Sequence, residues 1–251
     1  MGALSKIFTI GVIASSLGFG TACGGSSDSP PGPLGKHYDE MHIAQVPLDQ
    51  KGAVVQTQQD WSVAKMENAK AEADHNEMTQ KLSVVRNDAK AARLKLDSAI
   101  SNKKSAEASN DTNKTNVAQR DVRNAELLVK AADARVRYHE TYRGYLKKYW
   151  RYTQENMYWR EAQYEVAKSE IGKKNNVAPK GVTYDSFPAQ EQQRNKRTAS
   201  AKSGAESEKG RAQSARDNWL KLQQEADQAN GTPSQFPDPM VQSVTPTTAT
   251  P

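Results

Sequence analysis

The residues that could do chemistry gather in one aromatic and basic segment. Seven of the nine tyrosines and two of the four tryptophans fall between residues 138 and 164. A helical period places five side chains on the outer face of this segment: Arg137, Lys147, Lys148, Arg151 and Tyr158. Aromatic rings interleaved with cations can stack on sugar rings or grip acidic chains. The segment is therefore a candidate binding face for a protein partner or a cell-wall glycan.

The same rings could instead form the core of a bundle. At about 100° per residue the tyrosines form one stripe and Leu146, Trp150 and Met157 lie on an adjacent one, so the apolar arc covers about half of the helix. A central helix packed between two neighbours needs such an arc. Hairpin geometry puts His75 opposite Tyr149, Trp61 near Gln163, and Leu82, Tyr142 and Trp219 in one layer. The expected bundle core contains Trp61, Leu82, Tyr142, Tyr149 and Trp219. The sequence leaves both interpretations open.

No catalytic site or cofactor is predicted. His37, Asp39, Glu40 and His42 are metal-ligand types within six residues. They follow a flexible leader without a second ligand set, so they are interpreted as solvated and no metal site is predicted. The chain lacks a Gly-rich phosphate loop, a nucleophile elbow and a histidine-containing triad pattern. A thin helical bundle also offers no concave pocket. These observations argue against an enzyme.

The elements that must position the aromatic segment are long helices, so the expected fold class is all-α. Residues 49–110 contain no proline and only Gly52, and the positions from Trp61 to Ala106 form an alanine-rich coiled-coil seam. A second helix is expected over 117–171, after a polar cluster at 110–116. The matched lengths favour a long antiparallel helical hairpin. The lack of Gly or Pro in the turn leaves one continuous helix open.

A third helix, expected over 189–229, would fold back to complete a three-helix coiled-coil-like bundle with boundaries 49–229. A loop at 175–188, with two prolines and Gly181, precedes this helix. Asn230, Gly231 and Pro233 should end it. The Thr/Pro-rich tail 230–251 is expected to be disordered. Seam positions left unpaired within one chain would allow homo-oligomers.

Composition fits a thin core. Only 36% of the residues are hydrophobic and the mean hydropathy is -0.85. Lys and Arg outnumber Asp and Glu by 35 to 29, and the charges are interspersed along the chain. This mild basic excess suits anionic surfaces and gives no reason to expect nucleic acid as a partner.

The N-terminus predicts export. Lys6 precedes an apolar run over 7–19 that is too short for a membrane span of about 20 residues, so residues 1–22 are predicted to be a signal peptide. The run Gly20-Thr21-Ala22-Cys23 resembles a bacterial lipobox, with Gly20 where that family usually has Leu. The resemblance implies cleavage before Cys23 and a diacylglycerol on its thiol. An ordinary signal peptide with an incidental cysteine is the alternative.

The residues after Cys23 fit an anchor. Gly, Ser and Pro dominate 24–35, and residues 23–48 are expected to form the lipidated cysteine and a flexible, disordered tether. By resemblance to lipoproteins, Gly24 favours the outer membrane, facing the periplasm or the cell exterior. The resemblance of the body to periplasmic coiled-coil proteins is one of architecture only. The expected function is a lipid-anchored envelope structural or adaptor protein that docks partners through a coiled-coil surface. The alternative is a chaperone-like or glycan-binding module that uses the basic aromatic face of residues 137–160.

Overall fold

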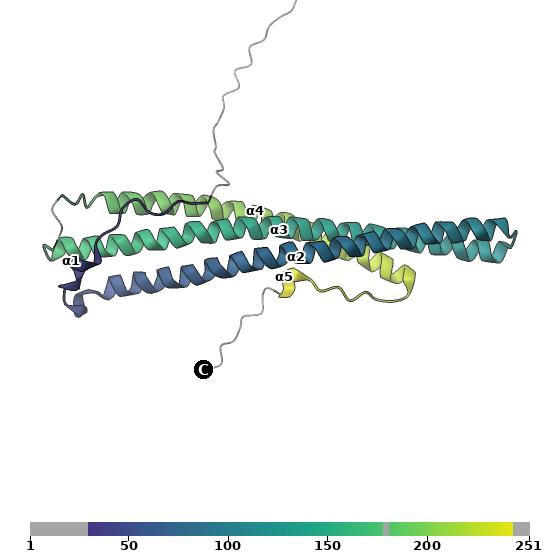
Figure 1. Ribbon diagram of the computed structural model, residues 1–251, viewed down its shortest axis with the longest axis horizontal. Helices are drawn as coiled ribbons and strands as arrows, with labels where there is room; N and C mark the ends of the chain where they lie inside the picture. Colours follow the sequence, from purple (N-terminus) through teal and green to yellow (C-terminus); the bar gives the residue numbers. More distant parts are fainter. Residues whose placement is uncertain (1–29, 178–180, 243–251) are drawn as a thin grey trace, which may run out of the picture. The chain divides into compact units, whose positions relative to one another are not determined.

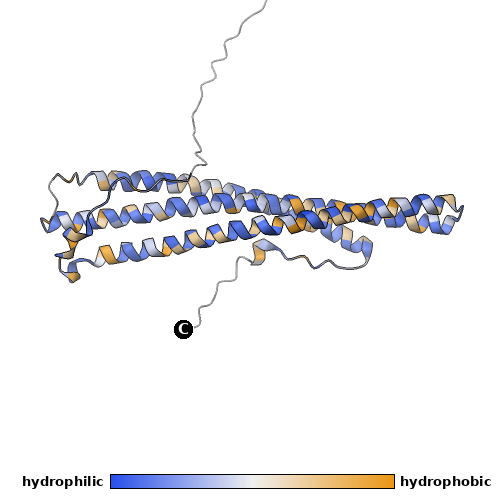
Figure 2. Ribbon diagram, viewed as in Figure 1, coloured by the Kyte–Doolittle hydropathy of each residue, from blue (hydrophilic) through white to orange (hydrophobic). Residues whose placement is uncertain are grey.

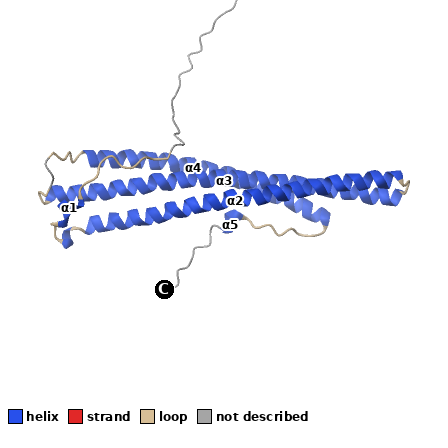
Figure 3. Ribbon diagram, in the orientation of Figure 1, coloured by secondary structure: helices blue, strands red, loops and turns tan. Residues whose placement is uncertain are grey.

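The computed structural model describes residues 30–177 and 181–242, and those from Pro31 onward belong to one compact unit. The predicted signal peptide, Cys23 and the first part of the tether lie outside the described residues. Every element is helical (Figure 3): α1 (Glu40–Ala44), a 3₁₀ turn (Leu48–Gln50), α2 (Gly52–Ala108), α3 (Thr112–Lys174), α4 (Ser186–Asn230) and α5 (Pro239–Gln242). The all-α fold is confirmed. None of the described helices is long and apolar enough to cross a membrane.

The chain reverses between α2 and α3, so these helices form the antiparallel hairpin and not one continuous helix (Figure 1). Asn110 adopts a left-handed conformation with φ 53°. Asp111 then caps α3 by accepting hydrogen bonds from the backbone N–H groups of Asn113 and Lys114 at 3.0 and 3.1 Å. Asparagine enters the left-handed region more readily than most residues. The turn therefore needs neither glycine nor proline.

The hairpin register lies within one residue of the expected one at two aromatic contacts. Trp61 stacks on Tyr164 with ring centroids 5.8 Å apart, and His75 stacks on Trp150 at 5.7 Å. On α2 the buried residues follow the predicted seam from Ala64 through Leu82 to Ala89. The remaining seam positions, as far as Ala106, are half-buried. Hydrophilic residues predominate along the three long helices, with hydrophobic residues interspersed among them (Figure 2).

Helix α3 lies between α2 and α4 and packs against both, while α2 and α4 make almost no contact with each other (Figure 1). Helix α4 ends level with Asn124 of α3, whose side-chain amide donates to the carbonyl of Ala229 at 3.1 Å. Gly231 closes α4 in the left-handed conformation with φ 71°. The arrangement is thus a layer of three helices, and part of α3 remains uncovered.

The register of α4 differs from the expected one. Trp219 stacks on Tyr138, with ring centroids 5.4 Å apart and planes at 10°, and is not level with Tyr142. The cause lies in the loop before α4. Val177, Val182 and Tyr184 pack against the apolar cluster at the end of α3, so the chain folds back over α3 before α4 begins. This displaces α4 by about one helical turn.

The predicted flexible tether does not extend to residue 48. Tyr38, Ile43 and Val46 are buried in a cluster with Ile171 and Phe187. The backbone of this segment is also tied to α4, since the Gln190 side-chain oxygen accepts from the N–H groups of Gly35 and Lys36, and Arg194 donates to the carbonyls of Gly32 and Pro33. The large apolar side chains order residues 31–48, in spite of the glycines and prolines before them.

The disorder predicted from residue 230 does not begin there either. Asp238 accepts a hydrogen bond from the Tyr138 hydroxyl at 2.6 Å and pairs with Arg216. The guanidinium carbon of Arg135 lies over the ring of Phe236, 3.9 Å from the centroid of that ring. Residues 231–242 therefore return along the bundle, held by the half-buried carboxylate of Asp238 and the aromatic ring of Phe236. Residues 243–251 lie outside the described part.

Candidate docking groove on the central helix

A stripe of tyrosines runs along α3 at the alternating spacing of a heptad repeat. The rings of Tyr138, Tyr142, Tyr145, Tyr149 and Tyr152 contact one another in sequence, with centroids 5.8 to 6.1 Å apart. We call these five residues the tyrosine stripe. Tyr138 and Tyr142 are buried, whereas the last three are half-buried. The stripe thus passes from the core to the surface.

Tyr142, Tyr145 and Tyr149 of the stripe form the floor of a groove of about 410 Å³. The groove exists because α2 and α4 flank α3 without closing over it. Helix α2 contributes Glu67, Lys70 and Asp74 to its rim, α4 contributes Lys209, and Met240 of α5 closes one end. We call this feature the tyrosine groove. It combines an aromatic floor with a rim of both charges.

The tyrosines of the groove are neutral hydrogen-bonding groups. Burial, and then the neighbouring Tyr149 and Tyr142, raise the pKa of Tyr145 to about 12. Burial also raises the pKa of Tyr149, and the carboxylates of Glu67 and Asp74 on the rim add to this effect. The structure shows no hydrogen bond from the hydroxyl of Tyr145 or Tyr149 to another described residue. The groove can therefore offer both ring faces and hydroxyls to a ligand.

A short helix of the same chain already covers one end of the stripe. The Tyr138 hydroxyl is joined to Asp238, and the backbone N–H of Met240 donates to that hydroxyl at 3.3 Å. Met240 packs against the apolar cluster that contains Tyr138, Tyr142 and Trp219. A helical turn thus fits this surface of α3, and the stripe continues beyond it uncovered.

Two members of the predicted basic face are engaged inside the molecule. Arg151 donates to the buried carboxylate of Glu155 at 2.9 Å, which also accepts from Arg197. Tyr158 lies under Arg194, whose guanidinium carbon is 5.2 Å from its ring centroid. These side chains hold α4 on α3. They do not form a free binding surface.

The other three predicted cations lie at different angles around α3. Arg137 and Lys147 are exposed and Lys148 is half-buried. The step from Lys147 to Tyr149 turns through about 200°, so Lys147 lies on the side of α3 opposite the tyrosine stripe. The step from Lys148 to Tyr152 turns through only about 40°, so Lys148 lies beside the stripe. The structure does not bring the five predicted residues and the stripe into one basic aromatic face.

Of the five residues expected in the core, three are buried and two are half-buried. Leu82, Tyr142 and Trp219 are buried, with 1, 3 and 2% of their surface exposed. Trp61 is half-buried, with the Lys65 ammonium 3.2 Å from its ring centroid, and Tyr149 is a floor residue of the groove. The core and surface interpretations of the aromatic segment each describe one half of it.

The residues considered as metal ligands have structural contacts instead. Asp39 caps α1 by accepting from the N–H of Met41 at 2.9 Å, and Glu40 accepts from the Tyr164 hydroxyl at 2.9 Å. The His37 ring lies 3.6 Å from the carboxylate of Glu165. Within the described ranges, no group of three or more His, Cys, Asp or Glu side chains could hold a metal ion.

No family model, curated protein or solved structure matches the chain. The site therefore rests on its own geometry. The groove was missed at the level of sequence, although a signal for it was present. The heptad spacing of the tyrosine stripe is separate from the stripe of Leu146, Trp150 and Tyr164 that faces α2, so one α-helix carries two seams.

Proposed function

We propose that the chain is a lipid-anchored adaptor of the bacterial cell envelope that docks an amphipathic helix of a partner protein in the tyrosine groove. One observation carries the docking part. The tyrosine stripe has heptad spacing, α5 covers one end of it, and the rest is open between α2 and α4. Heptad stripes are the surfaces against which helices pack.

The rim supports a helical partner. A helix laid along the stripe would touch α3 through the rings and would pass between α2 and α4. Its flanking positions would meet Glu67, Lys70 and Asp74 on one side and Lys209 on the other. Charges at flanking positions set the choice and the direction of the partner in coiled coils. The expected partner segment has apolar residues at heptad spacing, with both charges beside them.

The anchoring part is supported by the N-terminal sequence. An apolar leader, small residues before the single cysteine and a Gly/Ser/Pro-rich segment are typical of bacterial lipoproteins of the outer membrane. Acyl chains contribute about 0.8 kcal/mol per buried CH₂ to membrane binding. Cys23→Ser should abolish labelling with palmitate and move the protein from the membrane fraction to the soluble fraction. Membrane retention of the unlabelled variant would contradict the anchor.

Site-specific photocrosslinking tests the docking proposal in cells. A photoreactive phenylalanine replaces Tyr145 or Tyr149 in the groove, and in a matched control variant it replaces Lys147 on the opposite side of α3. We expect the groove positions alone to give one discrete adduct, and mass spectrometry should identify the crosslinked segment as an amphipathic helix.

Three results would contradict the proposal: equal adducts at Lys147, no adduct at Tyr149, or adducts only to a second copy of this chain. The alternative function, glycan binding by the basic side, predicts that Lys147→Glu with Lys148→Glu abolishes binding to cell-wall glycan. Under the docking proposal these substitutions leave the groove adduct unchanged.

A further inference from the structure

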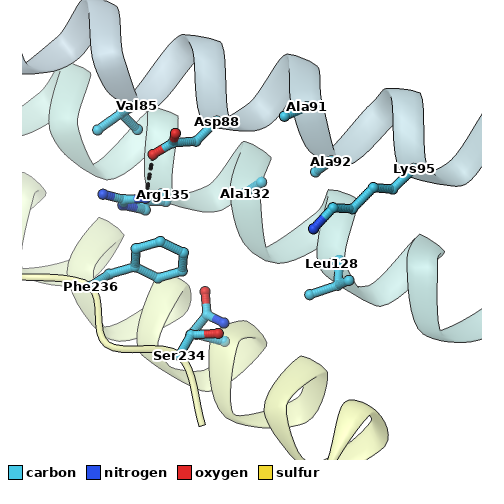
Figure 4. Close-up of a pocket in the computed structure, with 11 residues that line it drawn as sticks. Val85, Asp88, Ala91, Ala92, Lys95, Leu128, Ala132, Arg135, Ser234 and Phe236 are labelled. Atoms are coloured by element: carbon cyan, nitrogen blue, oxygen red, sulfur yellow. Dashed lines mark hydrogen bonds and ion pairs between the residues drawn. The ribbon is translucent and has the colours of Figure 1, made fainter. Parts of the chain in front are cut away.

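A second concave site lies beside Phe236, in the segment 231–242 that returns along the bundle. It is a cavity of about 280 Å³ between α2, α3, the end of α4 and the returning tail (Figure 4). Its volume lies just below the range for small-molecule sites, which begins at about 300 Å³. The sequence argued against a pocket in a thin bundle. The pocket forms because the tail provides a fourth wall.

Small side chains create the space. Ala92 of the α2 seam, Ala132 of α3 and the exposed Ala91 line the cavity. Core interiors are normally packed without voids larger than a water molecule. Val85, Leu128 and the ring of Phe236 supply the apolar surface around the void (Figure 4). The cavity thus has an apolar body with room for a small ligand.

The charges of the cavity carry one unbalanced positive unit. Arg135 pairs with Asp88 at 3.0 Å, and the side chain of Arg135 is only 8% exposed. Its buried Nε–H has no hydrogen-bond partner. Lys95 extends over the cavity from α2 (Figure 4), and its ammonium makes no ion pair with any residue the structure describes. Lys95 is exposed to solvent, and a cation without an ion pair beside an apolar wall favours a ligand that brings one negative charge.

We propose that this cavity binds a small amphiphilic monocarboxylate, whose carboxylate pairs with Lys95 and whose apolar body lies against Val85, Leu128 and Phe236. Arg135 adds positive potential from the opposite end of the cavity. Burial lowers the pKa of its guanidinium, and the neighbouring Asp88 opposes this effect. The proposal is independent of the tyrosine groove.

Calorimetric titration of the full chain with octanoate tests the charge requirement. Octanamide has nearly the same shape without the charge, and octylamine carries the opposite charge. We expect one octanoate per chain, octanamide binding weaker by about tenfold, and no binding of octylamine. Equal binding of octanoate and octanamide, or no binding of octanoate, would overturn the proposal.

Substitutions locate the site. Lys95→Gln should weaken octanoate by about tenfold, whereas Lys104→Gln, at an exposed position of the same helix, should not change it. Ala132→Leu should fill the cavity and abolish binding with an unchanged urea midpoint. If that variant is unstable, Ala92→Leu fills the cavity from α2 instead. Octanoate binding that survives both a folded cavity-filling variant and Lys95→Gln would place the ligand elsewhere and refute the assignment.

Discussion

Gly172 and Gly144 both lie in α3, and the same substitution to alanine should have opposite effects at the two positions. A Cβ on Gly172 would overlap the hydroxyl and the ring of Tyr38, whereas a Cβ on Gly144 meets nothing within 4 Å. Tyr38 cannot easily move aside. It is 2% exposed, packs edge-on against Phe187 at 6.0 Å, and donates from its hydroxyl to the carbonyl of Val177 at 3.3 Å.

The magnitude follows from two opposing terms. Replacing glycine by alanine inside a helix stabilises it by about 1 kcal/mol. Gly144→Ala should show this gain directly. At Gly172 the gain is opposed by displacement of Tyr38, whose buried ring contributes about 2 to 3 kcal/mol. We expect Gly172→Ala to lower the free energy of unfolding by about 1 to 2 kcal/mol.

Urea denaturation followed by circular dichroism measures both variants under identical conditions. A double-mutant cycle with Tyr38→Ala separates the clash from other effects, because Gly172→Ala should stabilise the protein once the ring is gone. If Gly172→Ala alone stabilises the chain as much as Gly144→Ala does, residues 31–48 are not packed on the end of α3, and the argument fails.

Three further predictions concern the tail, the core and a buried histidine. Asp238→Asn should release the tail and speed proteolysis after residue 230, because Asp238 joins Tyr138 and Arg216, whereas Asp217→Asn, at an exposed position, should not. Trp219→Ala should cost about 3 to 5 kcal/mol in urea unfolding, since this indole is 2% exposed; a loss under about 1 kcal/mol would contradict its place in the core. Burial, and then Arg135, lower the pKa of His139 from 6.5 to about 4, so the unfolded chain binds the proton more readily in that window. Stability should therefore fall by about 2 kcal/mol from pH 7 to pH 5, and His139→Leu should remove that fall.

The fold could be predicted from the sequence wherever a helical period repeats over many turns. The seam from Trp61 to Ala106 and the polar cluster at 110–116 favoured the hairpin over one continuous helix and predicted its register within one residue. The third helix was predicted within three residues at its start and one at its end. Long periodic segments carry this information because every heptad repeats it.

The remaining features depend on a few apolar residues that do not recur at a regular spacing. Tyr38 and Ile43 order one of the two segments that composition marks as flexible, and Phe236 helps to order the other, through contacts that the sequence does not specify. The register of α4 depends on a loop that folds back, and the opening between α2 and α4 depends on the position of both around α3. Sequence pattern indicates which faces are apolar, and it does not indicate which of them stay uncovered.

Because α2 and α4 make almost no contact with each other, each is joined to the rest of the described body mainly through α3. A force applied between α2 and α4 therefore passes mainly through the side chains of that one helix. Each of the two outer helices can therefore separate from α3 without the other. A helix bound in the tyrosine groove would contact both α2 and α4. Its binding should therefore slow amide exchange in α2 and α4 together, so that the two helices unfold as one cooperative unit.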